Sequence, residues 1–139
     1  MRAPAFFAFT LLAVALAGCG PMDRPELKRE VQSIRSLATE GAFLASDVAA
    51  DRTKVTFVRV HAREMGDAAE HSAEKIQDSE VPEEIGFARN RAIKIAMDLS
   101  DDLGQLEVFP GNEGKAAQVR TSLRQEAANA EKLVQDLNR

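Results

Sequence analysis

The two histidines are the first place to look for chemistry in this 139-residue chain. His61 and Glu64 are three residues apart, so on a helix they lie one turn apart on one face, as ligands of a metal site in a helical bundle do. Di-iron bundles, however, use Glu-x-x-His motifs on two helices, and the chain contains no such motif. We therefore expect no metal site, and we expect His61 to form a hydrogen bond with a neighbouring helix. His71 lies off the apolar stripe and is interpreted as a solvated side chain.

The carboxylate pairs do not have the spacing that acid–base catalysis needs. Asp101 and Asp102 are adjacent in sequence, as are Glu83 and Glu84. On a helix such neighbours point roughly 100° apart, so they do not share a substrate. The chain also lacks the Gly-x-Ser-x-Gly motif of a serine hydrolase. We expect a protein that is not an enzyme.

The single cysteine, Cys19, follows an apolar segment near the N-terminus. Met1-Arg2 gives this segment a positive start, and residues 6–17 are apolar except for Thr10. The run has the length of the apolar region of a signal peptide, and it is shorter than the ~20 residues of a membrane-spanning helix. It ends in the sequence Leu16-Ala17-Gly18-Cys19.

This ending resembles the lipobox of bacterial lipoproteins, with Leu16 three positions before the cysteine and the small residues Ala17 and Gly18 next to it. The resemblance covers residues 1–19. It implies that residues 1–18 are a signal peptide, recognised through Leu16, Ala17 and Gly18, and that the Cys19 thiol receives a lipid. The implied location is the cell membrane or the outer membrane, facing the periplasm or the exterior. The alternatives are an ordinary secretory signal with a coincidental cysteine, or an uncleaved anchor.

The composition narrows the function of the remaining chain. With Cys19 acylated, no thiol is left for a disulfide, a zinc site or a nucleophile. After residue 18 the chain carries 17 basic and 22 acidic residues, so we expect no nucleic-acid partner, because phosphates require a clustered cationic face. Trp and Tyr are absent, which argues against a platform on which bases or sugars stack.

Four stretches must position any functional side chain. Apolar residues recur in steps of three and four over residues 27–48, 55–76, 85–106 and 116–137, which is the helical period. The narrow apolar seams predict an all-α fold, a small up-down antiparallel four-helix bundle. We assign residues 1–18 to the signal peptide, 19–25 to the lipidated cysteine and a short tether, and 26–139 to the bundle.

The three predicted breaks between these stretches differ in strength. Residues 79–84 contain Pro82, and residues 108–114 contain Pro110 with Asn112 as the expected N-cap. The first break lacks glycine and proline. We place it near residues 50–53, with Asp51 or Thr53 as the cap. The alternative is one continuous helix over residues 25–78, in a three-helix or swapped assembly.

In an up-down bundle the first and third connections meet at the end farthest from the lipid. This distal end carries the charged Arg52 and Lys54 and the apolar Val108 and Phe109. One hypothesis is that these four residues form a tip at which a partner docks, because exposed apolar loop residues usually serve contact. The other is that Phe109 folds back and plugs the end of the bundle.

We therefore expect a membrane-anchored, non-enzymatic module of the cell envelope, without a cofactor. Its expected partners are the membrane, through the lipid on Cys19, and another envelope protein or its own copies. A third possibility is a structural spacer between envelope layers. The alternative function is an extracytoplasmic carrier of a small ligand or haem, for which His61 and Met97 are the available haem ligands. The many small residues on the seams argue against a carrier, because they let helices approach closely and leave little cavity.

Overall fold

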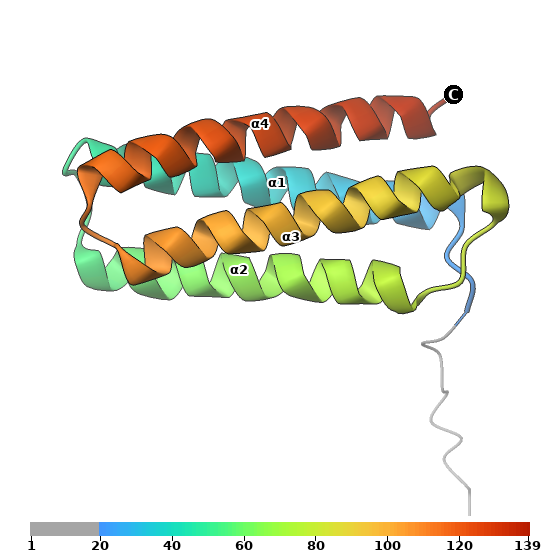
Figure 1. The fold of residues 1–139 in the computed structure, drawn as a ribbon, viewed down its shortest axis with the longest axis horizontal. Helices are drawn as coiled ribbons and strands as arrows, with labels where there is room; N and C mark the ends of the chain where they lie inside the picture. Colours follow the sequence, from blue (N-terminus) through green and yellow to red (C-terminus); the bar gives the residue numbers. More distant parts are fainter. Residues whose placement is uncertain (1–19) are drawn as a thin grey trace, which may run out of the picture.

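The computed structural model describes residues 20–139, so Leu16, Ala17, Gly18 and Cys19 lie outside the described residues. Residues 20–139 form four α-helices and one short 3-10 turn, η1. They are α1 (Arg24–Ala49), α2 (Val55–Asp78), η1 (Glu83–Ile85), α3 (Gly86–Val108) and α4 (Glu113–Leu137). Figure 1 shows the four long helices side by side and alternating in direction. The predicted all-α antiparallel four-helix bundle is confirmed. Within residues 20–139, no helix has an apolar stretch long enough to cross a membrane.

Two of the helices begin at a side-chain cap. Asp23 Oδ1 accepts a hydrogen bond from the backbone N–H of Glu26 at 2.8 Å, at the start of α1. Asn112 Oδ1 accepts one from the N–H of Lys115, also at 2.8 Å, so the expected N-cap of α4 is confirmed. Such a cap satisfies a backbone donor that has no partner within the helix. Pro82 directly precedes η1, which leads into α3.

The turn between α1 and α2 lies where the sequence places it, so the alternative of a continuous helix over residues 25–78 is wrong. Asp51 has a φ of 53°, in the left-handed region. Its N–H donates to Val48 O at 3.0 Å, and the N–H of Arg52 donates to Asp47 O at 2.8 Å. This pair of bonds is the Schellman motif, which usually has glycine at the left-handed position. Asp51 therefore ends α1.

The expectation that Asp51 or Thr53 caps α2 is wrong. The residue at the cap position is Lys54, whose side chain makes no capping hydrogen bond. The chain has an extended backbone there and turns into the helix at Val55. Asp51 cannot cap α2, because it belongs to the turn that ends α1.

The core lies along the axis of the bundle and is built mainly from aliphatic side chains and alanine. α1 packs most closely against α4, and α2 against α3, whereas α1 and α2 touch over a smaller region. Small residues permit the close approach. At Gly41 of α1, an added Cβ would lie 2.9 Å from Leu103 Cδ2 and 3.1 Å from Leu123 Cδ1. The largest fully buried side chains are Met22, Leu27, Ile34, Ile76, Leu99, Leu103, Leu106, Leu123 and Leu133.

Met22 extends the bundle beyond the start of α1. Its side chain is only 1% exposed and belongs to the hydrophobic core. Its backbone N–H donates to the carbonyl oxygen of Glu80 at 2.8 Å, which fastens it to the connection between α2 and α3. Met22 therefore packs with the helices although it precedes the start of α1.

Candidate functional site

The structure brings the four predicted tip residues to one end of the bundle. Arg52 and Lys54 lie in the α1–α2 turn, Val108 is the last residue of α3, and Phe109 follows it. Figure 1 shows this turn and the α3–α4 loop at the same end, opposite the α2–α3 connection and the C-terminus. The α3–α4 loop also lies close to the start of α2, because a Cβ on Gly111 would be 3.2 Å from Val55 Cγ2.

More apolar surface gathers at this end than the sequence predicts. We call the exposed apolar residues at this end the distal apolar surface. They are Val108 (64%), Phe57 (55%), Val60 (52%), Val55 (46%) and Phe109 (44%). Sequence reasoning missed Phe57 and Val60, which flank the buried Val58 on α2. The signal was present, since apolar residues at 55, 57, 58 and 60 are too many for one narrow seam.

Phe109 does not plug the end of the bundle. Its ring is 44% exposed, and the Lys115 ammonium lies 5.7 Å from the ring centroid. Pro110 is the buried residue of this loop. The hypothesis that Phe109 fills the bundle end is wrong, because nearly half of this residue stays exposed.

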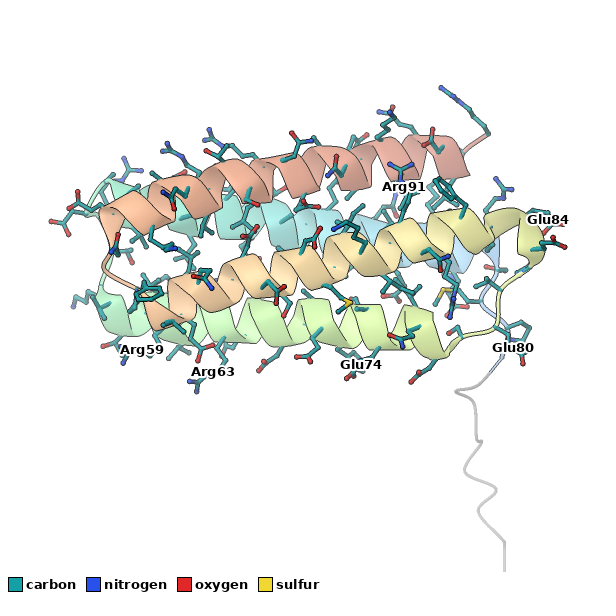
Figure 2. The ribbon with its side chains drawn as sticks, in the orientation of Figure 1. Arg59, Arg63, Glu74, Glu80, Glu84 and Arg91 are labelled. Carbon is teal, nitrogen blue, oxygen red and sulfur yellow. The ribbon has the colours of Figure 1, made fainter. Side chains whose placement is uncertain are left out.

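The two basic tip residues differ in what they contact. The Arg52 guanidinium donates to Asp47 Oδ1 from Nη2 at 2.8 Å and from Nε at 3.2 Å, so it fastens the α1–α2 turn. Lys54 is exposed. A shallow hollow of about 560 Å³ at this corner is lined by residues 51–54 and Phe57. In Figure 2, Arg59 and Arg63 lie in the half of α2 near this end and project outward from the bundle.

His61 forms the predicted hydrogen bond with a neighbouring helix. Its Nε2 lies 2.9 Å from Glu40 Oε1 on α1, and its ring stacks on Phe57 with centroids 5.2 Å apart. Nδ1 is 3.7 Å from Glu64 Oε2, one turn further along α2. The bond to Glu40 holds the distal part of α2 against α1. Within residues 20–139, no three His, Cys, Asp or Glu side chains are grouped as metal ligands. Met97 is 55% exposed on α3, so it does not face a shared interior with His61.

One motif escaped the sequence analysis. Ser72 and Lys75 have the Ser-x-x-Lys spacing that provides a serine nucleophile in some acyl-transfer enzymes. Ser72 is only 7% exposed and faces the core, so a substrate cannot reach its hydroxyl. Lys75 Nζ lies 2.5 Å from Glu30 Oε1 on α1, and this bond is the main reason that the pKa of Lys75 is raised. The arrangement supports packing of α2 on α1 and not catalysis.

Comparison of the chain with protein-family models, with curated proteins and with solved structures finds no match. Its function is therefore argued from its own residues.

A second polar feature lies between α3 and α4. Glu126 is only 9% exposed, and it borders a hollow of about 200 Å³ together with Lys94 and Asp98. Burial raises the pKa of Glu126, and the negative charges of Asp98 and Asp102 raise it further. The side-chain amide of Asn129, which donates to Glu126 Oε2 at 3.4 Å, and the Lys94 charge act in the opposite direction. Glu126 is thus an internal carboxyl that holds its proton more tightly than an exposed one.

Proposed function

We propose that this chain is a lipoprotein of the cell envelope that acts without catalysis. In this proposal Cys19 carries the lipid, and the distal apolar surface contacts another protein of the envelope. The observation that carries the proposal is the placement of the phenylalanines. All four that lie within residues 20–139 are more than 40% exposed: Phe43, Phe57, Phe87 and Phe109.

The exposed phenylalanines matter because aromatic side chains normally contribute most to a core. Burying a phenylalanine stabilises a fold by roughly 1.5–3 kcal/mol. This bundle instead fills its core with leucine, isoleucine, valine, methionine and alanine. Aromatic residues are enriched at the centres of protein–protein interfaces, where a few of them supply most of the binding energy. Phe57 and Phe109 on the distal apolar surface fit that use.

The position of this surface also suits contact with a protein. α1 has 26 residues and is therefore about 39 Å long. Because α1 begins five residues after Cys19, a lipid on that cysteine puts the opposite end of the bundle well away from the membrane. Exposed bases (Lys54 and Arg59) and exposed acids (Asp51 and Glu113) both lie at this end, which suits a partner with charges of both signs around an apolar centre.

The carrier alternative has less support. The seams are narrow, as the contacts at Gly41 show, and the largest buried side chains occupy the interior. The Phe43 ring borders a small apolar hollow of about 190 Å³ on the α1–α4 face. That hollow is a surface feature and is smaller than the roughly 300–1,000 Å³ of a typical ligand pocket.

The proposal is tested by site-specific photo-cross-linking in the native envelope. A photoreactive amino acid replaces Val108, and a matched control replaces Met97, which is also exposed and apolar and lies on the same helix. We expect one defined cross-linked protein from position 108 and none from position 97. The double variant Phe57→Ala and Phe109→Ala should abolish the product while leaving the melting temperature nearly unchanged.

Three outcomes contradict the proposal. Equal cross-linking from positions 108 and 97 would show that the partner does not bind specifically at the distal apolar surface. A cross-linked product that contains only this chain would show that the partner is a second copy of the chain and not another protein. A Cys19→Ser variant that is processed normally and still sediments with membranes removes the lipid anchor.

A further inference from the structure

The end of the bundle opposite the distal apolar surface carries one strongly exposed aromatic residue. Phe87 is the second residue of α3 and is 77% exposed, more than the other large apolar side chains of residues 20–139. The Arg91 guanidinium lies 6.0 Å from the centre of its ring, and Arg91 Nη1 is 3.3 Å from Asp136 Oδ2 on α4. The ring therefore lies on the outside of the bundle, next to a cation, and is not part of the core.

The chain enters the bundle at this same end. Met22 is buried, and its N–H donates to Glu80 O in the connection that leads to α3. In Figure 1 the start of α1, the α2–α3 connection and the C-terminus lie together at one end, and Figure 2 shows Glu80, Glu84 and Arg91 there. Phe87 follows Glu80 by seven residues. Phe87, in the first turn of α3, and the anchored Met22 therefore lie at the same end of the bundle, which we call its end face.

Very little chain separates this face from Cys19. Only Gly20 and Pro21 lie between Cys19 and the buried Met22. Three residue steps span at most about 11 Å, even when fully extended. A lipid on Cys19 therefore holds the end face of the bundle at the depth of the lipid headgroups, with no length of free chain to let it move away.

We infer that Phe87 rests in the headgroup region of the membrane and fixes how the bundle stands on it. This inference rests on the proposed lipidation of Cys19. A phenylalanine on an amphipathic surface buries its ring at the boundary between headgroups and acyl chains, roughly 5–10 Å deep. Arg91, beside the ring, is paired with Asp136 of α4, so it holds the ring at the surface of the bundle. The occupant of this exposed aromatic site is the membrane itself.

The test uses tryptophan fluorescence, since the chain contains no tryptophan of its own. The full, acylated protein is made as Phe87→Trp and is reconstituted into vesicles of zwitterionic phospholipid in which some lipids carry a shallow nitroxide quencher. Zwitterionic lipid is chosen because this end carries both exposed acids, such as Glu84, and exposed bases, such as Arg24. The matched control is Phe57→Trp, an exposed phenylalanine in the first turn of α2 at the opposite end.

We expect the quencher to reduce the emission of the Phe87→Trp protein strongly and to shift it to shorter wavelength. The Phe57→Trp protein should keep its intensity, because 21 residues of α2 separate it from the other end of that helix, about 32 Å along the bundle. A flexible linker of about ten residues inserted between Gly20 and Pro21 adds roughly 18 Å of mean reach and should weaken the quenching at position 87.

The outcomes separate this inference from the proposal beneath it. Mass spectrometry of Cys19 comes first, and a protein without the diacylglyceryl group overturns both. If the protein is acylated but the quencher does not reduce the emission of the Phe87→Trp variant, the inference about Phe87 is wrong and the proposed lipid anchor stands. Equal quenching at positions 57 and 87 also overturns it, since the bundle then lies flat on the membrane. Emission that changes with protein concentration, and not with quencher, assigns Phe87 to a contact between copies and overturns it as well.

Discussion

Two glycines within helices allow a close test of how tightly the bundle is packed. Gly41 lies within α1 and Gly104 within α3. Replacing glycine by alanine inside a helix stabilises it by about 0.8–1 kcal/mol, because glycine has the greater backbone entropy to lose. This gain is the same at both positions, as is the effect on the unfolded chain. Any difference between Gly41→Ala and Gly104→Ala therefore measures the space around the new methyl group.

The structure predicts opposite results at the two positions. Nothing lies within 4 Å of a Cβ at Gly104, so Gly104→Ala should raise the free energy of unfolding by about 1 kcal/mol. A Cβ at Gly41 would lie 2.9 Å from Leu103 Cδ2 and 3.1 Å from Leu123 Cδ1. Both leucines are fully buried, and overfilling a core costs about 1–3 kcal/mol. Gly41→Ala should therefore be about 1–3 kcal/mol less stable than Gly104→Ala.

Urea denaturation followed by far-UV circular dichroism measures this difference on the domain from Gly20 onward. A difference of 1 kcal/mol corresponds to roughly 3–6 °C in melting temperature for a domain of this size, so thermal melts provide a second reading. If the two variants are equally stable, or if Gly41→Ala is the more stable, then α1 and α4 have room between them and the narrow seam is refuted.

Three further predictions concern single side chains. Asp51→Gly should raise the free energy of unfolding by up to about 1 kcal/mol in urea titrations, because glycine adopts the left-handed φ of 53° without strain; a loss of stability would contradict this. Phe109→Ala should cost less than about 1 kcal/mol, because the ring is partly exposed, whereas Leu106→Ala should cost about 2–5 kcal/mol; similar losses in thermal melts would return Phe109 to the core. The pKa of Glu126 in the folded protein is raised above its ordinary value of 4.5. The free energy of unfolding therefore falls as the pH rises from 4.5 through the higher pKa of the folded state. Glu126→Gln should therefore be more stable than the parent at pH 7 and no more stable at pH 4, and a gain of equal size at both pH values would contradict the assignment.

The sequence predicted the elements and the direction of the helices well. The helices could be predicted because the residues that face the core recur with the helical period. The start of α4 could be predicted because Asn112 has a side chain that caps helices. The α1–α2 turn was harder to place, because its left-handed position holds Asp51 in place of glycine. Local sequence does not reveal the Schellman hydrogen bonds that make aspartate acceptable there.

The candidate site was predicted only in part. Sequence placed Arg52, Lys54, Val108 and Phe109 at one end, because connections alternate in an up-down bundle. It did not give the exposure of Phe57. The apolar residues at 55, 57, 58 and 60 are too many for one narrow seam, but the pattern does not say which of them lie outside it. Nor did it show the burial of Met22, because the contact with Glu80 joins segments almost sixty residues apart.

The pairing of the helices has a consequence for how the domain is made. α1 finds its main partner in α4, at the other end of the sequence, while α2 and α3 pack on each other. A chain that emerges from its N-terminus can close the inner hairpin first, but α1 must wait for the final helix before its apolar stripe is covered. Contacts between such distant segments slow folding, because a long loop has to close before they form. If the chain crosses a membrane from its N-terminus, as the proposed lipidation of Cys19 requires, this delay favours an open chain during translocation.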